Sequence, residues 1–186
     1  MLDWLFPQTV EIIASRINGP VRVTRLRRRY AVWAGGFEQS GPLVESLWRK
    51  ALKDIRSESP PRHILILGFG TGSAAEVISK KWPDSRVTGV EIDPVMISLG
   101  KKYFHLSRFP NLEIINLPAL QCFKTLTKKK RVFDLILVDL YIGNKPALVK
   151  IPKSLLSKTG VIITNKLEGV KNSTLLETAD SNVGER

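Results

Sequence analysis

The chain has 186 residues, of which 43% are hydrophobic, so it can bury a sizeable core and should form one main domain. No apolar run approaches the roughly 20 residues of a membrane span, and the first residues lack the basic start and apolar centre of a signal peptide. We therefore expect a cytoplasmic protein with no membrane partner. Cys122 is the single cysteine, which excludes an internal disulfide and a cysteine-based metal cluster, and the two histidines are too isolated to predict a metal site.

The formal net charge of +12 at pH 7 should attract anions and argues against polycationic substrates. Much of this charge lies in two basic clusters, at residues 25–29 and 128–131. Aromatic residues are sparse around both clusters, which favours solvated strand and helix ends over a nucleic-acid surface. A nucleic-acid partner is therefore possible but not favoured.

The N-terminal part of the chain has the pattern of a small antiparallel sheet. Residues 9–16 and 21–26 alternate between apolar and polar side chains on either side of Asn18-Gly19, a strong hairpin signal. A third short strand at residues 30–33 runs into Gly35-Gly36. We expect this sheet to occupy residues 1–41.

The following segment alternates between strand and helix patterns. Strands are expected at residues 64–67, 86–90, 112–117, 131–139 and 160–165, and helices at residues 42–56, 73–82, 94–104 and 119–129. Asp93 is a good helix N-cap, and Pro94 suits the first helical position. This alternation predicts right-handed βαβ units and an α/β, doubly wound, mostly parallel sheet over residues 42–165.

The last segment, residues 166–186, is polar and has little periodicity, so we expect a tail without another strand.

The turn after the first parallel strand carries three glycines, Gly68, Gly70 and Gly72, which would let the backbone turn tightly and approach a ligand. The second strand ends in Glu91, whose carboxylate would arrive beside this turn and could accept both hydroxyl hydrogens of a ribose. The third glycine of a dinucleotide fingerprint is replaced by Ser73, and the G-x-G-x-G spacing is that of S-adenosylmethionine-type folds. The pattern predicts a nucleoside site.

Four segments together resemble the spermidine synthase-like proteins, which are aminopropyltransferases within the class I methyltransferase fold. They are Gly-Phe-Glu-Gln-Ser at 36–40, the strand and glycine turn at 63–72, Gly-Val-Glu-Ile-Asp-Pro at 89–94 and Phe-Asp-Leu-Ile-Leu-Val-Asp at 133–139. The resemblance extends over about residues 9–165 and includes the N-terminal sheet, which ordinary methyltransferases lack. It implies a Rossmann-like methyltransferase sheet that usually closes with two further strands, for which we find no pattern in this sequence.

The resemblance also implies roles for single residues. Gln39 would contact the nucleoside, Glu91 would hold its ribose, and Asp139 would help to deprotonate the attacking amine. The co-substrate would be S-adenosylmethionine or its decarboxylated form, the acceptor a small-molecule amine, and no metal would be needed. Family members commonly pair as dimers, so a homodimer is expected.

This chain departs from true polyamine synthases at three acidic positions. Thr71 replaces an acid in the glycine turn, Ile142 replaces an acid after the catalytic aspartate, and Pro118 stands where an acid would bond adenine. Two of these acids bind cationic amines through charge-assisted bonds worth roughly 1.5–3 kcal/mol each. The chain therefore resembles a divergent branch of the family.

Three functional hypotheses follow. The first is a transferase that moves an aminopropyl or related group to an amine, and the second is a methyltransferase, for which the basic charge would favour an anionic substrate such as RNA. The third is a non-catalytic protein that binds a nucleoside or a partner. In structural terms alone, Gln39 would be a polar cap before a helix and Asp139 an acid that ends a strand.

Overall fold

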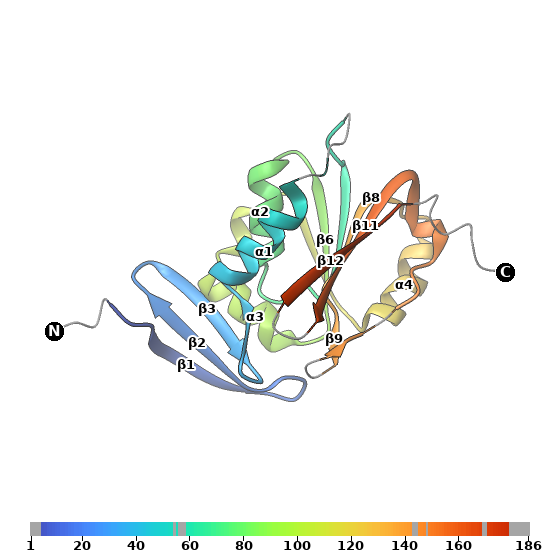
Figure 1. Cartoon of the computed structure of the whole chain (residues 1–186). Helices are drawn as coiled ribbons and strands as arrows, with labels where there is room; N and C mark the ends of the chain where they lie inside the picture. The colour runs from blue at the N-terminus through green and yellow to red at the C-terminus, as the bar shows by residue number, and fades with distance from the viewer. Residues whose placement is uncertain are drawn as a thin grey trace.

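The computed structural model describes residues 5–53, 55, 59–142, 145–147, 149–168 and 171–178. They form two larger sheets and one two-stranded sheet, with helices packed around the larger ones (Figure 1). The N-terminal sheet has the strand order β1-β2-β3-β4, and the main sheet has the order β12-β11-β8-β5-β6-β7.

The N-terminal sheet is an antiparallel meander of β1 (Gln8–Ser15), β2 (Gly19–Leu26), β3 (Arg29–Ala34) and β4 (Phe37–Ser40). The predicted hairpin at Asn18-Gly19 is confirmed, since Ser15 pairs with Gly19. The sequence predicted three strands, but there is a fourth. Gly35 and Gly36 have positive φ angles of 58° and 85°, so they turn the chain tightly back and let Phe37 pair with Ala34.

The main sheet contains five parallel strands, β11 (Leu156–Glu168), β8 (Phe133–Val138), β5 (His63–Leu67), β6 (Arg86–Glu91) and β7 (Leu112–Asn116). This confirms the predicted doubly wound sheet. The strand predicted to be buried on both faces is β5, in which residues 64–67 are all fully buried.

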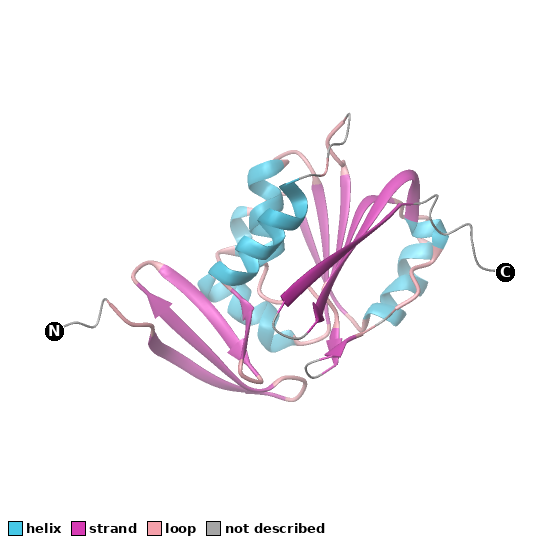
Figure 2. Cartoon of the chain, viewed as in Figure 1, coloured by secondary structure: helices cyan, strands magenta, loops and turns pink. Residues whose placement is uncertain are grey.

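Helices cover both faces of the main sheet (Figure 2). α1 (Pro42–Lys53) and α2 (Ser73–Lys81) pack with Ile64 and Ile66 of β5, whereas α4 (Ala119–Lys128) and η2 (Lys153–Leu155) pack with Leu65 and Leu67. Successive side chains of a strand point to opposite faces, which is why the two pairs enter different cores. Cys122 lies in the second core.

The N-terminal sheet packs on α3 (Pro94–Tyr103), which is followed by η1 (Leu106–Arg108). Val21, Val23 and Val32 share a buried cluster with Met96 and Leu99 of this helix. The predicted cap is confirmed, since the Asp93 side chain accepts a hydrogen bond from Val95 N and Pro94 begins the helix. The small sheet is therefore fixed to the main domain through α3.

The prediction of a C-terminal tail without another strand is wrong. Residues 166–168 extend β11, and β12 (Lys171–Thr178) pairs antiparallel with it, from Glu168 opposite Lys171 to Val161 opposite Thr178. An edge strand needs backbone hydrogen bonds more than apolar side chains, so the polar composition concealed it. Residues 179–186 lie outside the described part of the chain, and the domain limits at residues 41 and 165 remain predictions.

Two short strands, β9 (Tyr141–Ile142) and β10 (Lys145–Pro146), pair with each other after β8. Among the described residues, no helix has the length and hydropathy to cross a membrane.

Candidate active site

The carboxyl ends of β5, β6 and β8 bring three predicted site elements together: the glycine turn, Glu91 and Asp139. In open α/β sheets, ligands bind outside these strand ends. Backbone hydrogen bonds hold the arrangement. Gly68 N and Phe69 N both donate to Val90 O at 3.0 Å, and Asp139 N donates to Leu67 O at 2.8 Å.

Gly68 has to be glycine because the chain beside it leaves no room for a side chain. Its φ is +80°, and a Cβ atom would lie 2.1 Å from the carbonyl oxygen of Asp139. The first glycine of the turn thus lets the backbone pass directly against the residue proposed for catalysis.

The predicted position of Glu91 beside the turn is confirmed. Gly70 N donates to Glu91 Oε2 at 2.7 Å, and Asp93 N donates to Glu91 Oε1 at 2.9 Å. Burial raises the pKa of Glu91 above its ordinary value, and these backbone hydrogen bonds limit the rise. Each carboxylate oxygen can accept a second hydrogen bond, so the group retains capacity for two ribose hydroxyls.

Gly72 has a different environment from the other two glycines. It has a φ of +102° and caps the N-terminus of α2, and a Cβ atom there would lie 2.5 Å from Leu106 Cδ2. The need for glycine at this position therefore comes from packing against η1.

Gln39 lies on β4, next to the glycine turn. Its carbonyl oxygen is 3.6 Å from the position of a Cβ atom on Gly70, and the neighbouring Ser40 Oγ accepts a hydrogen bond from Thr71 N. The Gln39 side-chain amide donates to Ala34 O at 3.2 Å. The residue is at the turn, but its amide is engaged in the small sheet.

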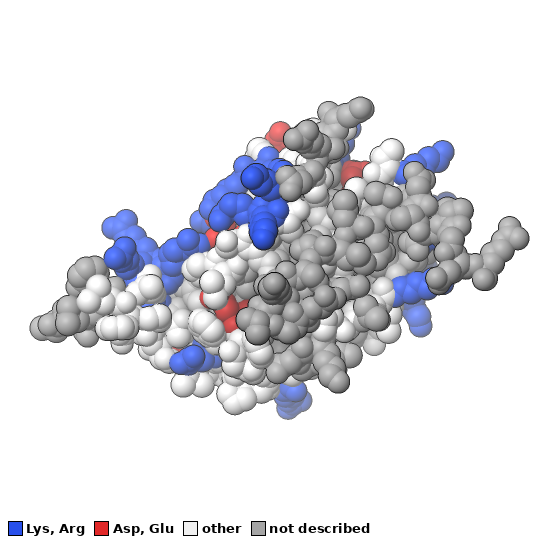
Figure 3. Space-filling view, viewed as in Figure 1, with Lys and Arg blue, Asp and Glu red and all other residues white. Residues whose placement is uncertain are grey.

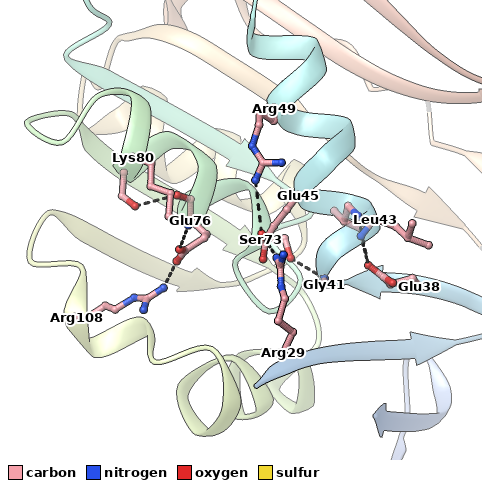
Figure 4. A network of polar contacts seen from close by, with 12 residues as sticks. Arg29, Glu38, Gly41, Leu43, Glu45, Arg49, Ser73, Glu76, Lys80 and Arg108 are labelled. Atoms are coloured by element: carbon pink, nitrogen blue, oxygen red, sulfur yellow. Dashed lines mark hydrogen bonds and ion pairs between the residues drawn. The ribbon is translucent and has the colours of Figure 1, made fainter. Parts of the chain in front are cut away.

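The polar residue that caps the first helix is Glu38, which the sequence reading missed. Glu38 Oε1 accepts hydrogen bonds from Leu43 N at 2.8 Å and Val44 N at 3.3 Å (Figure 4). An acidic side chain just before a helix was the available signal.

Asp139 follows β8 and has an enclosed carboxyl group, although the residue as a whole is only partly buried. Desolvation raises its pKa to about 6, against the weaker lowering effects of Asn165 and Trp48. Asn165 Nδ2 donates to Asp139 Oδ1 at 2.8 Å. Trp48 Nε1 is buried and makes no hydrogen bond to a described residue, although the indole lies close enough to lower this pKa.

Asn165 and Trp48 were not predicted as site residues. The sequence placed Asn165 at the end of a parallel strand, and the pairing of Thr164 with Val138 then brings it beside Asp139. Trp48 has the helical spacing of a core residue and is indeed 1% exposed, so only the tertiary structure shows that its indole nitrogen faces a polar site. Tyr141 O–H donates to Asn165 O at 3.3 Å, which places it at the same edge.

Two of the three departures from the polyamine synthase pattern have a clear structural setting. Thr71 is fully buried, and its Oγ1 has no hydrogen-bond partner among the described residues. Pro118 caps α4, where its carbonyl oxygen accepts hydrogen bonds from Gln121 N and Cys122 N at 3.0 Å. The side chain of Ile142 lies outside the described part of the chain.

The chemistry of this site fits a nucleoside with an amine acceptor. Glu91 offers carboxylate acceptors, and Asn165 Oδ1 is a buried acceptor without a partner among the described residues, next to Asp139. Within the described residues, no group of three or more His, Cys, Asp and Glu side chains could hold a metal ion.

The chain shares this architecture with known transferases. The profile of the family described as "Methyltransferase domain" matches residues 64–157, about half of the chain. The polyamine aminopropyltransferase of Vibrio vulnificus is 30% identical over 125 residues, which cover 63% of this chain and 42% of the relative. This chain thus spans less than half the length of that relative.

Solved structures agree on the fold. A probable spermidine synthase from Corynebacterium glutamicum superposes with a TM-score of 0.62 at 18% identity, over 87% of this chain and 64% of that one. A spermidine synthase in complex with the transition-state analogue AdoDATO gives 0.62 at 16% identity, over 85% and 56% of the two chains. The chain belongs to the methyltransferase domain family. Within it, the protein is a spermidine synthase-like member of the class I methyltransferase fold.

Proposed function

We propose that the protein binds an S-adenosyl-type nucleoside between the glycine turn and Glu91 and transfers an aminopropyl group from it to a small amine, with Asp139 as the general base. The single observation that carries this proposal is the Asp139 carboxylate, which is enclosed, bonded to Asn165 and adjacent to Gly68. The aminopropyltransferase relatives support the choice of reaction class.

The bound nucleoside would supply a sulfonium-activated carbon. In the transfer, a nitrogen–carbon bond forms, the carbon–sulfur bond breaks and its electron pair stays on sulfur. A protonated amine has no lone pair, so Asp139 takes or orients its proton. A carboxyl group with a pKa of about 6 is ionised at neutral pH and is a stronger base than an ordinary aspartate.

Glu91 and the glycine turn have the binding role. Glu91 would accept hydrogen bonds from the ribose hydroxyls, while Gly68 and Gly70 allow the ligand to approach the backbone. Gln39 would contact the nucleoside after its side-chain amide leaves Ala34 O. Much of the remaining catalysis would come from proximity and alignment.

The test is calorimetric titration of the purified chain with S-adenosylmethionine, decarboxylated S-adenosylmethionine and methylthioadenosine. We expect the decarboxylated form to bind most tightly and the Glu91→Ala variant to lose binding of all three nucleosides. Preference for S-adenosylmethionine would instead favour methyl transfer, the second hypothesis, which the family profile supports. Binding of none would leave a non-catalytic partner-binding role.

The missing acids allow a second experiment on the acceptor. In the double variant Thr71→Asp/Ile142→Asp, the aminopropyl hypothesis expects tighter binding of a diamine such as putrescine. Unchanged amine affinity in a variant that still binds the nucleoside would argue against this reaction. Sedimentation of the same samples would test the homodimer, which, like the cytoplasmic location, remains a prediction.

A further inference from the structure

One pocket of the structure has a different set of lining residues from the candidate active site. It has a volume of about 280 Å³ and is formed by the start of β3, the outer sides of α1 and α2, and the segment from the end of α3 to η1. Of the residues proposed for the active site, only Gly72 contributes to it. The pocket and the proposed active site therefore use almost entirely different residues.

The lining of this pocket is strongly cationic. Five basic side chains contribute, against the two carboxylates of Glu45 and Glu76, which leaves an excess of three positive charges. The five are Arg28, Arg29, Arg49, Lys80 and Arg108. Figure 3 shows that Lys and Arg side chains gather over α1 and over the N-terminal sheet.

The two carboxylates position four of these cations (Figure 4). Glu45 Oε2 lies 2.5 Å from Arg29 Nη2 and 3.9 Å from Arg49 Nη2. Glu76 pairs with Lys80, Nζ to Oε1 at 2.7 Å, and with Arg108. Burial raises the pKa of Glu76, but the hydrogen bonds with these two cations lower it by more, so the pKa lies below its ordinary value. The carboxyl group is therefore held ionised.

The cations keep hydrogen-bond donors for a ligand. The side chains of Glu45 and Glu76 are 11% and 17% exposed, whereas their cationic partners are between 52% and 65% exposed. A guanidinium group has five N–H donors, and each of these arginines uses only part of them. Arg28 has no ion-pair partner among the described residues.

Protein stability does not account for this concentration of charge. Exposed ion pairs contribute little to stability, and the uncompensated cations repel one another across the pocket. Arginine pairs with phosphate in a bidentate manner, so an anion with several charges would relieve the repulsion and use the remaining donors. The volume lies just below the roughly 300–1,000 Å³ range of small-ligand pockets, which favours a compact ligand over a nucleic-acid strand.

We propose that this pocket binds a small ligand that carries two or more adjacent phosphate groups. Tyr30 and Tyr103, whose ring centroids are 4.9 Å apart, form its aromatic wall and would contact the organic part of such a ligand. The site stands apart from the proposed transfer reaction, since neither Glu91 nor Asp139 takes part.

The test is calorimetric titration of the full chain with inorganic pyrophosphate and, separately, with ADP at low ionic strength. We expect saturable binding of one equivalent of each. The variant Arg28→Ala/Arg108→Ala should weaken binding about tenfold or more, because charge-assisted hydrogen bonds are lost. In the Glu91→Ala variant, which should not bind the nucleoside at the active site, tighter binding of ADP than of pyrophosphate would add the aromatic wall to the pocket site, and equal affinity would assign the phosphates alone.

Three controls distinguish binding in this pocket from general charge attraction, from binding at the active site and from misfolding. Arg86→Ala removes one positive charge from an exposed position outside the pocket and should leave affinity unchanged. Glu91→Ala should also bind pyrophosphate normally, even if it loses the nucleoside. Unfolding midpoints should show that the double variant folds.

The proposal is overturned if no saturable binding of either ligand occurs, or if Arg86→Ala weakens binding as much as the double variant. It is also overturned if single-stranded RNA binds more tightly with increasing length and pyrophosphate does not compete. That result would define an extended nucleic-acid surface.

Discussion

Asp139, which we propose as the general base, also lowers the stability of the folded protein, because its charged carboxylate lies in an enclosed site. A carboxyl group whose pKa is raised on folding destabilises the folded state wherever it is ionised. For Asp139 this penalty is complete above about pH 6, shrinks as the pH falls from 6 towards 3.8, and is absent below that value.

We therefore predict that Asp139→Asn abolishes transfer and stabilises the protein at pH 7.5, by about 2–3 kcal/mol from the size of the pKa shift. Urea unfolding at pH 7.5, 6 and 5 should show this gain decreasing with pH. Asp84→Asn, at an exposed position, is the control and should show no such gain. Equal stabilities of wild type and Asp139→Asn at pH 7.5 would contradict the assigned burial.

Phe69 occupies the second position of the glycine turn, and its ring lies against Gly89. A Cβ atom on Gly89 would lie 2.2 Å from Phe69 Cδ2, and Phe69 is 3% exposed. Position 89 therefore has no room for a side chain while the Phe69 ring occupies this space.

We expect Gly89→Ala to cost about 1–3 kcal/mol of stability, the usual range for overpacking. The cost should fall in the background of Phe69→Ala, which removes the ring. A double-mutant cycle from urea unfolding measures this coupling. Additive effects of the two changes would show that the ring and Gly89 do not compete for space.

At the scale of elements, Asp93 joins the N-terminal hairpin to α3. Its Oδ1 caps the helix by accepting from Val95 N at 2.9 Å. Its Oδ2 accepts hydrogen bonds from Ser15 Oγ at 2.5 Å and Asn18 Nδ2 at 2.6 Å. One carboxylate thus fixes both the start of a helix and the turn between β1 and β2.

Asp93→Ala should cost about 2–4 kcal/mol, the sum of a lost cap and of buried hydrogen-bonding groups left unpaired. Asp93→Asn keeps a good capping residue and should cost less. Ser15→Ala tests the link to the hairpin and should have little further effect once Asp93 is replaced. If the losses from Ser15→Ala and Asp93→Ala simply add in thermal unfolding, the two elements are not coupled through this contact.

The predictions of single helices and strands succeeded where neighbouring residues carry the signal. The helix that begins at Pro94 and the strand of residues 64–67 depend on capping and on continuous apolar residues, which neighbouring positions encode. β4 is short and β12 is polar, so neither shows a clear apolar alternation, although each pairs with the strand directly before it. For this reason the sequence pattern missed both.

For the whole molecule, the net charge of +12 lowers the stability of the folded state. Like charges on a compact surface repel one another, and salt screens this repulsion. The screening length falls from about 30 Å at about 10 mM salt to about 10 Å at about 100 mM.

We predict that the unfolding temperature rises over this range of sodium chloride concentration. The variant Lys129→Gln/Lys150→Gln/Lys158→Gln removes three exposed positive charges outside the cationic pocket and should reduce the salt effect. Differential scanning calorimetry of both proteins gives the comparison. An unfolding temperature that falls with salt would mean that attractive ion pairs outweigh the repulsion.

The amino-acid sequence alone was enough to predict the doubly wound sheet, the N-terminal hairpin, the capped start of α3 and the position of Glu91 beside the glycine turn. These features follow from side-chain periodicity, from glycine and proline dihedral preferences, and from the rule that parallel strands end at one edge of a sheet. The contact of Asn165 with Asp139 and the gathering of basic residues from separate elements in one pocket become visible only in the folded structure. Each of these contacts joins segments whose relative placement is set by packing, and packing depends on the whole chain.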